Sequence, residues 1–166
     1  MTTTDKISYA ATATIACSLA SLASSTTTAA RGGAVVDNTA NLYDDAALTI
    51  AVKTSASALG ANPVCYVYIY GATGDLSTYG ASSAEAVGTD IAVTLDSPTN
   101  LKGPFVLACA ASSVTYRLTV GSIASLFGGV MPQKWGFVFQ NSTGQALDAT
   151  EGNHLKTYSG ISYTNG

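Results

Sequence analysis

The single histidine, His154, is the first place to look for catalysis, because hydrolase triads and most catalytic zinc sites use an imidazole. Asp148 and Glu151 lie close to it in the sequence. However, residues 148–154 are rich in turn formers, and no nucleophile or metal-ligand motif surrounds the histidine. We therefore predict that His154 lies in a solvent-exposed loop, that the chain has no catalytic residues and that it is not an enzyme.

Four acidic or amide side chains lie near one another and could offer oxygen ligands to calcium: Asp37, Asn41, Asp44 and Asp45. Their spacing does not match the Asp-x-Asp-x-Asp-Gly pattern of a calcium loop. Asp and Asn side chains often bond to the backbone of their own loop. We predict that these residues cap a loop, and we expect neither a metal nor a cofactor.

Three cysteines, Cys17, Cys65 and Cys109, each lie in an apolar, strand-like stretch. The odd count leaves at least one thiol unpaired, and no two are spaced as a Cys-x-x-Cys motif. We predict that all three are small buried side chains. A disulfide between two of them is possible but is not required. This cysteine usage is typical of a protein made in a reducing cytoplasm.

Aromatic residues give the next candidate site. Tyr66, Tyr68 and Tyr70 alternate along one predicted strand and share one of its faces. This stripe fits an exposed platform for sugar rings or another subunit, and it fits equally an outer sheet face packed under a loop. We interpret Trp135 as a core anchor because of its large apolar area. Asn141-Ser142-Thr143 matches a glycosylation motif, but we interpret it as a turn.

The composition excludes several classes of protein. The chain has 166 residues, which fits one domain. Charged residues make up 10% of it, and the net charge is -3, so no basic face is available to bind nucleic acid. Hydrophobic residues make up 47%, which excludes a charge-driven disordered chain. No apolar run approaches the roughly 20 residues of a membrane span, and we expect no membrane partner. The interrupted N-terminus does not fit a signal peptide.

Period-two alternation of apolar and polar residues predicts about eight strands. They lie near residues 7–19, 48–53, 64–70, 91–95, 105–111, 114–120, 135–139 and 156–164. The first is long for one strand and is expected to bend or change sheets, with odd positions from Ile7 to Leu19 on its buried face. Residues 105–111 and 114–120 resemble a hairpin around Ser112 and Ser113, and residues 24–33 are expected to form a loop.

Only two segments favour a helix, residues 122–127, which are followed by Gly128 and Gly129, and residues 82–87. The predicted fold is therefore all-β: an antiparallel β-sandwich, jelly-roll-like, with at most one or two short helical turns. We predict a single sandwich domain over residues 7–166, preceded by an N-terminal arm over residues 1–6.

Six short phrases, taken in order, resemble small structural proteins of tailed-bacteriophage virions. They are residues 36–43, 66–71, 96–101, 127–136, 141–144 and 151–154, and the resemblance extends from about Ile7 to Thr164. It implies a capsid decoration, or cement, protein. Such proteins are often β-sandwiches or jelly rolls and often trimeric. They bind the outside of the expanded head and brace neighbouring shell subunits. The resemblance brings no catalytic residues.

From this resemblance we expect the phage major capsid protein as partner, a homo-oligomer that is preferably a trimer, and a place on the outer capsid surface after assembly in the bacterial host cytoplasm. A weakly charged surface suits many copies packed closely together. The candidate interface residues are the arm residues Thr4, Asp5 and Lys6 and the stripe Tyr66, Tyr68 and Tyr70. The alternatives are a carbohydrate-binding or host-recognition module of a fibre or tail, and a tail-tube or head–tail joining protein.

Overall fold

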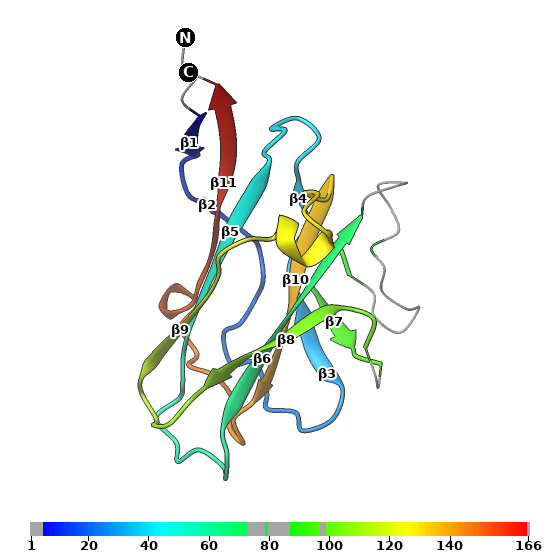
Figure 1. Ribbon diagram of the computed structural model, residues 1–166. Coiled ribbons are helices and arrows are strands. Elements are labelled where there is room, and N and C mark those ends of the chain that lie inside the picture. Colours follow the sequence, from blue (N-terminus) through cyan, green and yellow to red (C-terminus); the bar gives the residue numbers. More distant parts are fainter. Residues whose placement is uncertain (1–4, 73–78, 80–86, 97–98, 166) are drawn as a thin grey trace.

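The chain folds into two antiparallel β-sheets packed face to face (Figure 1), as the alternation predicts. The computed structural model describes residues 5–72, 79, 87–96 and 99–165, with the side chains of residues 5 and 165 left aside. We call the two sheets A and B. Sheet A contains β1 (Asp5–Tyr9), β2 (Ala13–Thr14), β5 (Asp45–Lys53), β9 (Thr115–Val120) and β11 (Leu155–Asn165). Sheet B contains β3 (Ala29–Gly32), β4 (Val36–Asp37), β6 (Val64–Ala72), β7 (Ile91–Thr94), β8 (Lys102–Ala108) and β10 (Lys134–Ser142).

The strand order places late parts of the chain in the middle of both sheets. Sheet A runs β1-β11-β5-β9, and β2 pairs with β11 beside β1. Sheet B runs β7-β3-β10-β6-β8, and β4 pairs with β10. The described strands therefore form an all-β antiparallel sandwich in which β10 and β11 each have neighbours on both sides.

The core lies between the sheets and is built from every second residue of their strands. Trp135 and Phe137 of β10 are fully buried, as are Leu48 and Ile50 of β5. The Trp135 ring meets the Tyr158 ring edge-on, with their centroids 5.5 Å apart. Burying a side chain of this size contributes about 1.5–3 kcal/mol. Trp135 is thus a core anchor, as predicted.

The first predicted strand does change sheets. The Ile15 N–H donates to the Lys156 carbonyl of sheet A, whereas the next carbonyl, that of Ala16, accepts from the Ala34 N–H beside β3. The predicted buried face holds for Ile15, Cys17 and Leu19 but is wrong for Ile7 and Tyr9, which are 58% and 67% exposed. The reason is the register: β1 and β2 pair with β11 one residue out of step. Ile7 and Tyr9 therefore lie on the face of β11 that carries Ser159, whereas Ala13 lies on the core face with Tyr158.

Two local predictions are also wrong. β8 pairs with β6 in sheet B while β9 pairs with β5 in sheet A, so the turn around Ser113 carries the chain between sheets and does not close a hairpin. The expected loop over residues 24–33 contains β3, which pairs with β7 and β10. Its burial alternates, but its sequence, Ala-Ala-Arg-Gly, shows no apolar alternation because the buried residues, Ala30 and Gly32, are small.

Helical structure among the described residues consists of two 3₁₀ turns. The first, η1 (Ala124–Phe127), ends at Gly128 with φ 75°, in agreement with the predicted turn and glycine cap. The second, η2 (Glu151–Asn153), precedes β11. Of the other predicted helix, only Val87 is described. Neither helical turn in the described part of the chain is long and apolar enough to cross a membrane.

Candidate functional site

His154 is buried, so the predicted exposed loop position is wrong. Its Nδ1 accepts from the Lys53 N–H at 3.3 Å, and its Nε2 lies 3.0 Å from the Asp148 carbonyl oxygen. This arrangement suits the tautomer with a proton on Nε2. Both ring nitrogens are used by the backbone, so the histidine links β5 to the segment before η2. It has the surroundings of a structural residue.

The acidic neighbours of His154 are structural as well. The Asp148 carboxylate accepts from the Asn153 amide at 2.8 Å and the Thr150 N–H at 3.0 Å, and these bonds lower its pKa to about 2. Glu151 pairs with Lys156 and accepts from two backbone N–H groups of the N-terminal segment. Both carboxylates are held by these structural bonds, and sequence proximity to His154 was therefore a misleading signal.

The predicted loop cap is present at Asp37, whereas Asp44 and Asp45 hold segments that are distant in the sequence. Asp37 accepts from both the N–H and the hydroxyl of Thr39, and Asp45 accepts from the Ala124 N–H at 2.8 Å. Asp44 accepts from the Tyr163 N–H at 2.7 Å. Within the described residues, no group of three or more His, Cys, Asp or Glu side chains could hold a metal ion.

The three cysteines are buried free thiols, as predicted. Burial raises the pKa of Cys17 to about 12, with the nearby Asp90 charge adding to the effect. Cys65 lies with its sulfur 3.9 Å from that of Cys109, and this contact together with burial raises the pKa of Cys65. A raised pKa keeps a thiol protonated and a poor nucleophile, so Cys17 and Cys65 serve packing.

The tyrosine stripe is packed on the outer face of sheet B. Tyr70 is 1% exposed, its hydroxyl donates to the Gly33 carbonyl at 2.7 Å, and its ring meets that of Tyr79 edge-on. Tyr68 is buried and Tyr66 is half-buried. For Tyr68 and Tyr70 the structure therefore agrees with the second interpretation, a sheet face packed under a loop, and corrects their assignment as interface residues. A second apolar cluster forms around them, with Ala30, Val93, Leu95, Leu101 and Val138.

A groove of about 590 Å³ crosses this outer face. Tyr68, Gln140 and residues 26–28 line it, and the Gln140 amide donates to the Thr27 carbonyl at 2.9 Å. Stacking on a sugar requires an open aromatic face, whereas Tyr68 is only 9% exposed. The groove consequently gives little support to the carbohydrate-binding alternative.

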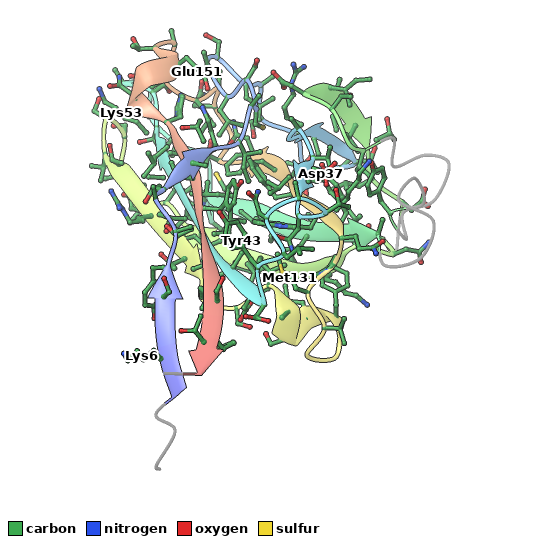
Figure 2. All side chains as sticks on the ribbon, turned by 90° about the horizontal axis from the view of Figure 1, so that it is seen from above. Lys6, Asp37, Tyr43, Lys53, Met131 and Glu151 are labelled. Atoms are coloured by element: carbon green, nitrogen blue, oxygen red, sulfur yellow. The ribbon has the colours of Figure 1, made fainter. Side chains whose placement is uncertain are left out.

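An exposed apolar cluster lies elsewhere, on a two-stranded ribbon formed by β1 and the end of β11. β5 pairs with β11 only as far as Ile161, so β11 beyond that point has β1 as its strand partner. Ile7 lies opposite Tyr163, and with Tyr9 they share one face of the ribbon. All three are more than half exposed. Figures 1 and 2 show the ribbon projecting from the sandwich, with Lys6 near its tip.

The ribbon changes the boundary of the predicted arm. Asp5 and Lys6 pair with Asn165 and Thr164, so they belong to β1 and not to a separate arm. Thr4 lies outside the described residues. Sequence reasoning found the polar N-terminus but missed Ile7, Tyr9 and Tyr163, because alternation shows that a strand has an apolar face without showing what covers that face.

In comparisons with known proteins, no protein-family model, curated protein or solved structure matches the chain significantly.

Proposed function

We propose that this protein is a structural protein of a tailed-phage virion, which decorates the outside of the capsid and stabilises it by bridging major capsid protein subunits. The observation that carries the proposal is the projecting β1–β11 ribbon with its exposed apolar residues Ile7, Tyr9 and Tyr163. Exposed apolar groups gathered on one element are typical of contact surfaces.

Other features of the chain support the same function. The titratable side chains described around His154 are engaged in structural bonds, which fits a binding role better than catalysis. Charged residues make up 10% of the sequence, so neighbouring copies on a shell repel one another weakly. Each copy contributes a modest contact, and several contacts together hold a bridging protein by avidity.

The test is binding of the purified protein to expanded phage heads, with bound copies counted against the major capsid protein. We expect a copy number comparable to that of the shell protein for the wild-type chain. Ile7→Asp should reduce binding at least about tenfold, because a charge would be buried in the contact. Val106→Asp is the matched control, since Val106 is 54% exposed on β8 in sheet B. A handful of copies per particle would instead assign the protein to a tail or fibre, and no binding would refute the proposal.

A further inference from the structure

β1 is the end strand of sheet A, and no other described strand pairs with its outer edge. The Ala10 N–H donates to the Gly160 carbonyl at 2.8 Å. In an antiparallel pair, reciprocally bonded residues alternate with residues whose backbone groups point away. Lys6 and Ser8 therefore bond to β11 like Ala10. The N–H and C=O groups that point to the free edge are those of Asp5, Ile7 and Tyr9.

From this edge we propose that two copies of the chain join through their β1 strands, in an antiparallel register centred on Ile7. Ile7 then lies opposite Ile7 of the second copy, and Asp5 lies opposite Tyr9. The outward backbone groups of these residues complete one another's hydrogen bonds. The sheets become continuous in the order β11-β1-β1-β11. The proposal concerns contact between copies and stands apart from the proposed capsid function.

Charge favours this register over its neighbours. Centring on Ile7 places Lys6 opposite the uncharged Ser8, whereas a register centred on Lys6 would place two ammonium groups opposite each other. The register centred on Ile7 also pairs all three outward-pointing residues of β1, whereas a register centred on Lys6 or Ser8 would pair only two of them within the strand. The strand is thus most complementary to itself in the register centred on Ile7.

Shape and packing favour a second copy as the occupant. The ribbon projects beyond β5 in both views, so two sandwiches joined at its edge lie at opposite ends without overlap (Figures 1 and 2). An isolated two-stranded ribbon is marginally stable, and a four-stranded sheet is more stable. Ile7 and Tyr163 of both copies would form one apolar row across the four strands.

The contact is small. A five-residue strand edge buries far less than the roughly 800 Å² per partner of a standard stable interface. Free chains are therefore expected to associate weakly and in a concentration-dependent way. The pairing gains strength where copies are already held close together. It joins two copies whether these are single chains or belong to neighbouring trimers of the kind implied by the phage resemblance.

Disulfide trapping tests the register directly. Residues in a bonded antiparallel pair have Cα atoms about 5.5 Å apart, which suits a disulfide, so Ile7→Cys should link two copies. Diamide, a thiol oxidant, takes up the two electrons and two protons released. Tyr9→Cys is the matched control, because Tyr9 is more exposed than Ile7 but the two copies of residue 9 would lie about 13 Å apart along the strands. The native thiols are buried, so the wild-type chain provides the blank.

We expect Ile7→Cys to form covalent dimers at least about tenfold faster than Tyr9→Cys, because only the former brings its sulfurs within bonding geometry. Equal rates, or faster linking of Tyr9→Cys, would overturn the proposed register. Ile7→Pro gives an independent readout in sedimentation experiments. It removes an N–H that points to the free edge and leaves the β1–β11 bonds in place. Unchanged association of Ile7→Pro would refute pairing through this edge.

Discussion

Lys156 and Glu151 form an ion pair in which the lysine is buried and the carboxylate reaches a third segment of the chain. One carboxylate oxygen accepts from the lysine. The other accepts from the N–H groups of Leu19 and Ala20 at 2.9 Å and 2.7 Å. Glu151 therefore connects β11 to the segment that crosses between the sheets, and a single side chain fixes the position of three elements.

Removing the Glu151 carboxylate should lower the free energy of unfolding more than replacing Lys156 by an apolar residue. Glu151→Ala leaves the Lys156 charge buried and two N–H groups without their acceptor, at an expected cost of about 1–3 kcal/mol because Glu151 is partly exposed. Lys156→Met keeps the volume and removes the buried charge, so a smaller loss is expected. Urea unfolding followed by Trp135 fluorescence measures both. A larger loss for Lys156→Met would contradict this reasoning.

Stability should fall in acid because of two carboxylates. Partial burial raises the pKa of Asp90, but hydrogen bonds from Arg31 and Ser18 outweigh this and lower it to about 2. The pKa of Asp148 is also lowered to about 2, by its Asn153 and Thr150 bonds. An unfolded Asp titrates near pH 3.9, so the stabilisation is complete above about pH 4 and is lost as the pH falls towards 2.

The measurement is the urea midpoint at several pH values across this window. Asp90→Asn should lower stability at neutral pH and flatten the decline in acid, because it removes the group whose protonation differs between the folded and unfolded states. Asp44→Asn is a control at an exposed carboxylate. An Asp90→Asn chain with the wild-type slope would show that Asp90 is not responsible.

Tyr70 and Gly136 should behave as a coupled pair. They lie opposite each other on β6 and β10, and a Cβ at position 136 would overlap the tyrosine hydroxyl. Gly136→Ala is expected to cost about 1–3 kcal/mol through this overlap. Tyr70→Leu removes the overlap, so the double variant should lose less than the sum of the single changes. A double-mutant cycle in urea measures the coupling, and additive losses would contradict it.

The three thiols should react slowly with thiol reagents in the folded protein. Cys17, Cys65 and Cys109 are buried, and burial raises the pKa of Cys17 to about 12. Ellman's reagent should therefore react slowly with the native chain and release three equivalents after denaturation. Fast reaction of one native thiol would show that its surroundings open. Fewer than three equivalents in denaturant would reveal a disulfide.

The sequence predicted those features of the fold that local residue patterns determine, and it failed where contacts between distant residues determine them. The alternation around Tyr68 and Phe137 predicts strands and a sandwich correctly, because one residue in two faces a core. The partner of each strand is not encoded locally, so the β8–β9 hairpin was wrong and β3 was missed. His154 looked like a loop residue because its partners, such as the Lys53 N–H, come from a strand a hundred positions away.

The central position of β10 and β11 has a consequence for how the protein is made. These strands come from the last part of the chain, yet each lies between earlier strands in its sheet. During synthesis, β5 therefore emerges well before its neighbour β11, and β6 emerges well before its neighbour β10. Neither sheet can close until β10 and β11 have been synthesised, and folding is expected to be slow because it depends on distant pairings. A truncated product lacking β11 would leave β1, β2 and β5 without a common partner and would be a substrate for proteases.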